Sequence, residues 1–202
     1  MRRLLAQLLL PLPLLTTACS QAQAAGLSAC DRAVRFSAAW FADPDVDNGK
    51  TASELTKTGS KAGGSGGGTQ LGHVTVQTQL AVVPQTTCTG VVVRLEYLKP
   101  VLRIAKEMAP GTCAYAWVMT HEQMHVRIHR DIARQFRELE YPWSQGASAA
   151  AILSFAKQEL DRLMQAQDRF DSPEEYAKNQ TVCGGEIPRL VKTNTPQKAP
   201  RP

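Results

Sequence analysis

The sequence lacks several patterns that mark common classes of protein. None of its cysteines forms a Cys-x-x-Cys pair, which argues against a cysteine-ligated zinc site. The Gly-rich stretch "GGSGGG" is not followed by the Gly-Lys-Ser/Thr end of a phosphate-binding loop. The formal net charge of +5 falls to +3 without Arg2 and Arg3, which is too small to indicate a nucleic-acid partner.

The N-terminus has the features of an export signal over residues 1–24. Two arginines precede an apolar run that is too short to span a bilayer, and Ala22-Gln23-Ala24 is a good cleavage site. The segment "TTAC" resembles the acylation box of bacterial lipoproteins, with Cys19 as the modified residue. We therefore expect an exported protein, periplasmic or secreted. Membrane attachment through a lipidated Cys19 is the alternative.

The remaining cysteines support export. Cys30, Cys88, Cys113 and Cys183 make an even number, which in an exported chain predicts two disulfides with three possible connectivities. In the sheet expected below, Cys88 and Cys113 fall at the same end. Cys88–Cys113 and Cys30–Cys183 are therefore the pairs we prefer.

Composition divides the rest of the chain into four parts. Residues 25–41 form an N-terminal segment with enough apolar weight to pack, and residues 42–70 are polar and Gly-rich, as in a flexible loop. Residues 71–186 carry the periodic patterns of one small domain. Residues 187–202 are basic and Pro-rich, as in a disordered tail.

The periodic patterns predict an α+β fold. Alternating residues indicate strands at 73–83 and 91–97, with a third at 101–108 after the Lys99-Pro100 break. Three helices are expected: about 112–140 with Thr112 as N-cap, about 149–170, and a short one capped by Ser172 with Pro173 at its first position. We expect an antiparallel three-stranded sheet, packed on the long helix and on an antiparallel second helix.

The long helix carries His121-Glu122-Gln123-Met124-His125, an HExxH motif. Residues i and i+4 share one face of a helix, so the two imidazoles can bind one zinc ion. Glu122 lies about 100° around the helix, where it can act as general base toward a zinc-bound water. The motif therefore predicts a metallopeptidase site.

The alternative is that both histidines are ordinary hydrogen-bonded core residues. On a helical wheel they fall in the middle of the apolar arc, where an unsatisfied polar group costs about 1–3 kcal/mol. A shared zinc ion would satisfy both rings, which favours the metal. The apolar arc consists of Ala114, Trp117, Val118, Ile128, Ile132, Phe136 and Leu139.

Two other histidines are poorer ligand candidates. His129 lies one turn beyond His125 with no intervening Gly turn, so we do not expect it to be the third ligand. It shares the flank of Glu122, and we expect it to face solvent, with a role in substrate binding as the alternative. His73 stands alone at a strand start, and we expect it to be structural.

The third ligand must come from another segment. If the second helix folds back on the first, the segment "FDSPEEY" reaches the level of the histidine pair. We expect Glu175 to be the ligand, with Glu174 and Asp171 as alternatives. A capping role for Glu175 is equally plausible on sequence grounds. Tyr176 is positioned to stabilise an oxyanion.

"HEQMH", followed by a second helix and a closing acidic turn, resembles the secreted zinc-dependent proteases of bacteria that have an HEQ-x-H motif. The likeness covers about residues 70–183 and implies a minimal zincin-like domain that holds zinc. The family carries a His in the closing turn, where this chain has Glu175 and Tyr176.

Two functions follow as expectations. The first is a zinc metallopeptidase of the cell envelope that acts on a peptide or protein, bound along the sheet edge by strand addition. The second is an envelope protein or lipoprotein with a structural metal or a degenerate site, which binds without turnover.

Overall fold

The structure is a computed structural model that describes residues 34–40, 43–61, 69–85, 90–143 and 148–193. The expected signal segment, Cys19, Cys30 and Cys88 lie outside the described residues. Within the described residues, no helix is both long and apolar enough to cross a bilayer. The elements in chain order are β1 (Val34–Ala39), β2 (Asp45–Asp47), α2 (Ala52–Lys61), β3 (Gly72–Pro84), β4 (Val91–Ile104), α3 (Cys113–Arg137), α4 (Ala149–Phe170), α5 (Pro173–Ala177), η2 (Lys178–Gln180) and α6 (Val182–Thr193).

The sheet is built around β4. The antiparallel strand β3 pairs along one edge of β4 from Val91 to Ile104. On the other edge β1 and β2 follow one another, and both run parallel to β4. The predicted α+β class is confirmed, but the prediction of an antiparallel sheet was wrong. The parallel strands come from residues 34–39 and 45–47, segments that were not expected to form strands.

The predicted break at Lys99-Pro100 does not end a strand. A single strand β4 runs through it, with Lys99 in the left-handed region at a φ of 46°. The register of β3 shifts opposite, between Thr75 and Gln77. A bulge of this kind accommodates a proline that cannot donate to the ladder. The strand ends at Ile104, so the third strand predicted at 101–108 is the end of β4 followed by a turn.

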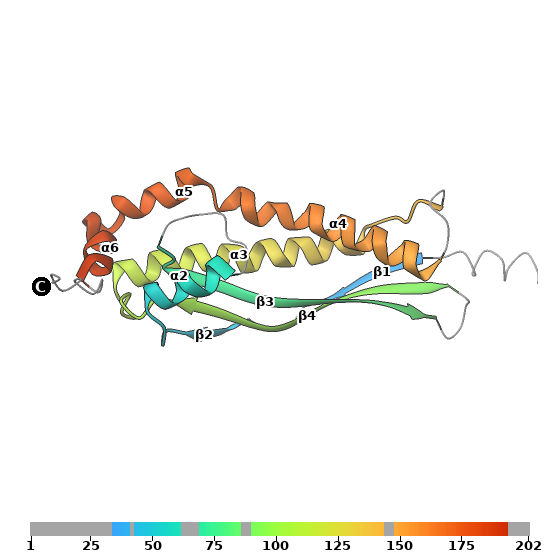
Figure 1. The fold of residues 1–202 in the computed structure, drawn as a ribbon, viewed down its shortest axis with the longest axis horizontal. Helices are drawn as coiled ribbons and strands as arrows, with labels where there is room; N and C mark the ends of the chain where they lie inside the picture. Colours follow the sequence, from blue (N-terminus) through green and yellow to red (C-terminus); the bar gives the residue numbers. More distant parts are fainter. Residues whose placement is uncertain (1–33, 41–42, 62–68, 86–89, 144–147, 194–202) are drawn as a thin grey trace, which may run out of the picture.

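The helices follow their local signals closely. Thr112 caps α3 by accepting a hydrogen bond from the Tyr115 amide, and Ser148 caps α4 in the same way. Ser172 caps α5, whose first residue is Pro173. Figure 1 shows α3 and α4 running side by side above the sheet, while α5 and α6 continue toward the start of α3. The long helix thus lies between the sheet and α4 over much of its length.

Two segments expected to be unstructured belong to the core. Leu55 of α2 and Ile187 of α6 are buried in one apolar cluster with Ile104, Met108 and Val118. A second cluster joins the other end of α3 to β1, β4 and α4 through Phe36, Leu95, Ile132, Phe136, Ile152 and Ala156. The prediction of a flexible loop at 42–70 was therefore wrong for the residues of β2 and α2, 45–47 and 52–61. The prediction of a disordered tail was wrong for residues 187–193, which belong to α6. Residues 62–68 and 194–202 lie outside the described residues.

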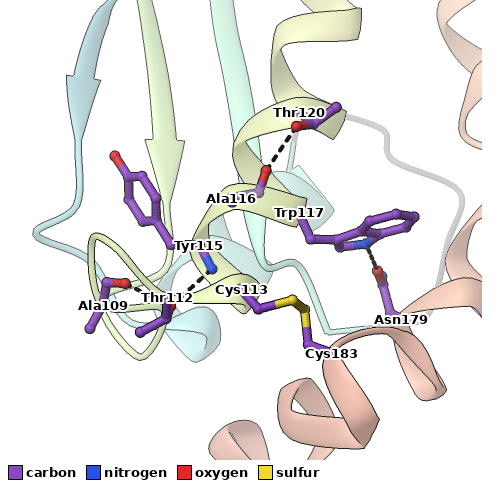
Figure 2. The surroundings of a disulfide bond; sticks show 9 residues. All are labelled: Ala109, Thr112, Cys113, Tyr115, Ala116, Trp117, Thr120, Asn179 and Cys183. Atoms are coloured by element: carbon purple, nitrogen blue, oxygen red, sulfur yellow. Dashed lines mark hydrogen bonds between the residues drawn. A yellow bond between two sulfur atoms is a disulfide. The ribbon is translucent and has the colours of Figure 1, made fainter.

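A disulfide joins Cys113, the first residue of α3, to Cys183 in α6, with a Cα–Cα distance of 5.7 Å. Figure 2 shows that Trp117, one turn after Cys113 on α3, donates a hydrogen bond to Asn179 next to this disulfide. Both pairings preferred from the sequence were wrong. The chain after α4 folds back over the start of α3 and brings Cys183, rather than the β3–β4 turn, to Cys113.

Candidate metal centre

The two histidines of the HExxH motif converge from successive turns of α3. Their Nε2 atoms lie 3.3 Å apart. Asp171, the C-cap of α4, brings Oδ1 to 3.2 Å from Nε2 of His121 and 3.1 Å from Nε2 of His125. Three possible ligand atoms from two helices therefore surround one point.

The geometry of this cluster fits a tetrahedral ion. Bonds of about 2.0–2.1 Å at tetrahedral angles place neighbouring ligand atoms roughly 3.3 Å apart. Oδ1 of Asp171 is buried against the two imidazoles. Lone pairs of neutral imidazoles that face a carboxylate oxygen repel one another, so the cluster requires a cation or added protons at its centre.

Glu175 takes a different place from the one expected. Its Oε1 lies 3.8 Å from Nδ1 of His121, on the side of the ring away from the cluster, and its Oε2 pairs with Lys178. Its backbone amide donates to the Ser172 hydroxyl, which caps α5, while the Ser172 amide donates to the Phe170 carbonyl and not to the Glu175 side chain. Glu174 is exposed. The alternative ligand, Asp171, occupies the position expected for Glu175, because the last turn of α4 already reaches the histidines.

His125 is oriented by a residue that sequence reasoning missed. Its Nδ1 lies 2.6 Å from Oε1 of Gln167, and the amide nitrogen of Gln167 donates to the His125 carbonyl at 3.2 Å. Because a glutamine oxygen can only accept, Nδ1 carries the proton and Nε2 keeps its lone pair toward the cluster. The sequence feature that could have identified Gln167 is its i, i+4 spacing from Asp171, which places both side chains on one face of the second helix.

Glu122 is held against the sheet. Its side chain is buried, and the nearby Val74 backbone has a small lowering effect on the pKa of its carboxyl group. Burial raises the pKa of Glu122 to about 7, although the imidazoles of His125 and His121 oppose this shift. The carboxyl group can therefore take up and release a proton near neutral pH.

The cluster has strong internal electrostatics. Burial opposes protonation of His125, but the facing carboxylates of Asp171 and Glu122 raise its pKa overall. Burial alone would raise the pKa of Asp171, yet the two imidazoles hold it well below its usual range. Asp171 is thus an anion over the working range of any protein, as a metal ligand must be.

Aromatic rings enclose the cluster. The ring of His121 stacks on Phe170 with centroids 4.8 Å apart, and Tyr176 lies 6.1 Å from His121. Burial raises the pKa of Tyr176 to about 12, and the carboxylates of Asp171 and Glu122 add to the effect. Tyr176 is therefore a neutral hydroxyl beside the cluster.

The buried face of α3 differs from the predicted one. Its centre passes through Glu122, Val126 and His129, which face the sheet, while His121 and His125 turn toward α4. The prediction that His129 faces solvent was wrong, because its side chain is 7% exposed. His73 lies on β3 and lines a cavity together with His121, Glu122 and His125, and burial lowers the pKa of His73.

A cavity of about 310 Å³ gives access to these groups. Its walls come from β3, α3, α4 and the chain after α4, and the cluster of His121, His125 and Asp171 lies along it together with Glu122.

Searches against protein-family models, curated proteins and solved structures found no significant match to this chain. Its function must therefore be argued from the site.

Proposed function

We propose that this protein is a zinc-dependent metallopeptidase of the bacterial cell envelope, with His121, His125 and Asp171 as metal ligands. One observation carries the proposal: a single carboxylate oxygen lies 3.1–3.2 Å from both imidazole nitrogens of an HExxH motif. Two imidazoles and one carboxylate are a usual set for catalytic zinc, which keeps its fourth position open. A bound zinc ion would supply Lewis acidity, polarising the substrate carbonyl and making water a better nucleophile.

The other residues have separate tasks. Glu122 accepts a proton from the water that adds to the carbonyl carbon, and it later gives that proton to the amide nitrogen as the C–N bond breaks. Tyr176 donates a hydrogen bond to the oxygen that becomes negative during the addition. Gln167 keeps His125 in the tautomer that leaves Nε2 free.

The decisive experiment measures zinc and hydrolysis on the same preparation. The mature protein should hold about one equivalent of zinc by mass spectrometry of metals and should cleave fluorogenic peptides. Glu122→Gln should keep the zinc and lose the cleavage. Glu138→Gln, at the exposed end of α3, is the matched control and should keep both. Less than a tenth of an equivalent, with none regained from added zinc, would end the proposal.

A second outcome separates the enzyme from a binding protein. Bound zinc, with no cleavage across broad peptide and peptidoglycan-peptide libraries, would favour an envelope protein whose metal is structural. The cavity that exposes the cluster supports the enzyme, because a structural site is closed by four protein ligands.

Export is part of the proposal and has its own measurement. Cleavage after Ala24 leaves a free N-terminus at Ala25, whereas lipoprotein processing leaves an acylated Cys19. The intact mass of the mature protein distinguishes these two forms. A mass that includes residues 1–24 would contradict both.

A further inference from the structure

The cavity also reaches residues beyond His121, His125 and Asp171, from α3, α4 and β3. His129 lies one helical turn beyond His125, about 6 Å further along the axis. Met164 lies nearly one turn before Gln167 on the facing helix, and Val76 comes from the irregular part of β3. All three residues line the same cavity as the metal ligands. The part of the cavity that these three residues line, called its inner end below, is therefore apolar on two sides and carries one imidazole.

That imidazole has unused hydrogen-bonding capacity. His129 is buried beside Trp40 and Tyr97, with ring centroids 6.1 and 5.6 Å away. Its Nδ1 has almost no accessible surface and no hydrogen-bond partner in the part of the chain that the structure describes, so a molecule in the cavity can reach the ring only through Nε2. A ligand that brings a polar group to Nε2 gains a hydrogen bond in a largely apolar surrounding.

Charge restricts what can enter. Burial lowers the pKa of His129 to about 4, so the ring is neutral at physiological pH. An acidic side chain would meet the carboxylates of Glu122, Asp168 and Asp171, and the described lining of the cavity contains no lysine or arginine. A cationic side chain would lose its water beside Val76 and Met164 and would face the neutral imidazole of His129. A neutral side chain avoids both costs.

We propose that this inner end is a specificity subsite for an uncharged substrate side chain with a hydrogen-bonding tip, of which tyrosine is the best fit, and that His129 selects it. The proposal rests on the peptidase function proposed above. His129 then bonds to the tip of the side chain, while Val76 and Met164 contact its apolar part. A site built to bond a hydroxyl discriminates strongly against the analogue without it, because its own polar group is then left unpaired.

The test compares paired peptides that differ only by tyrosine or phenylalanine at each position flanking the cleaved bond. Wild type should show a kcat/KM about tenfold higher for tyrosine at one position. His129→Leu should bring the ratio within twofold while zinc content and phenylalanine cleavage persist, and His129→Asn should restore part of it. Gln123→Ala, exposed on α3, should leave the ratio unchanged. A wild-type ratio within twofold at every position, or an unchanged ratio in folded His129→Leu, overturns the proposal.

A binding measurement keeps this inference separate from the enzyme function. p-Cresol and toluene are titrated into the zinc-loaded wild type and His129→Leu, with the methyl resonance of Met164 as the probe. Tighter binding of p-cresol in wild type alone, in a protein that cleaves no peptide, would contradict the peptidase and support the subsite. Equal binding of both compounds to wild type would overturn the subsite.

Discussion

Gly72 lies directly against the carboxyl group of Glu122. A β-carbon at position 72 would come within 2.4 Å of Oε1 and 2.6 Å of Cγ, distances that folded proteins do not show. Glycine is therefore what allows β3 to approach α3 this closely at Glu122.

Gly72→Ala should displace Glu122. We expect a loss of about 1–3 kcal/mol in the free energy of unfolding from overpacking, together with a fall in any peptidase activity. Urea unfolding measures the first effect. In a Glu122→Ala background the same substitution should cost much less, because the clashing atoms are gone. An equal cost in both backgrounds would show that this contact is not the cause.

Asp171 and Glu175 should differ sharply in their effect on zinc affinity. Asp171→Asn removes a ligand and should weaken binding by more than about 100-fold. Glu175 lies near Nδ1 of His121, on the side of the ring away from the cluster, so Glu175→Gln should weaken zinc binding by about tenfold or less. Competition with a fluorescent chelator measures both constants. Asp161→Asn, exposed on the same helix and not among the residues that line the cavity, is the control for lost charge. The reverse order of effects would restore Glu175 as the ligand.

His129 should make the fold sensitive to mild acid. Its pKa falls from 6.5 to about 4 on folding, so between these values the unfolded chain binds a proton that the folded chain does not. The contribution of the neutral His129 ring to the free energy of unfolding is complete above pH 6.5. It is lost as the pH falls from 6.5 to about 4, by up to about 3 kcal/mol. His129→Phe should show a flatter profile of unfolding free energy against pH. His73 shifts in the same direction, so the difference between the two profiles is the quantity to compare. Parallel profiles would contradict the prediction.

The Cys113–Cys183 disulfide should contribute strongly to stability. It closes a loop across a sequence separation of 70 residues, for which chain entropy predicts about 4 kcal/mol. The double variant Cys113→Ser/Cys183→Ser should lose that amount in urea unfolding without reductant. Wild type measured with reductant should approach the variant. A difference below about 1 kcal/mol would mean that other contacts, such as Trp117–Asn179, hold the segment in place.

Local rules predicted α3, α4 and α5 well. The limits of α4, the capping residues Thr112 and Ser172, and the spacing of His121 and His125 all depend on neighbours within a turn or two. The choice of Asp171 over Glu175 depends instead on the backbone of a single C-cap residue and on the level at which α4 meets α3, and neither can be read from composition.

The errors came from contacts that are distant in sequence. α2 and α6 lie in polar or Pro-rich stretches, yet each buries an apolar residue, Leu55 and Ile187, against the same core. The helical wheel of α3 assumed one packing partner, whereas the helix has two, the sheet and α4. That is why His129 was expected in solvent and is buried.

Asp171 caps the end of the 22-residue helix α4, so the length of α4 fixes the position of its carboxylate relative to the two histidines. Inserting or deleting one residue within it would swing the carboxylate about 100° around the axis and move it about 1.5 Å along. Related chains that keep this chemistry should thus vary in loop length and in exposed side chains while preserving the residue count from Ser148 to Asp171.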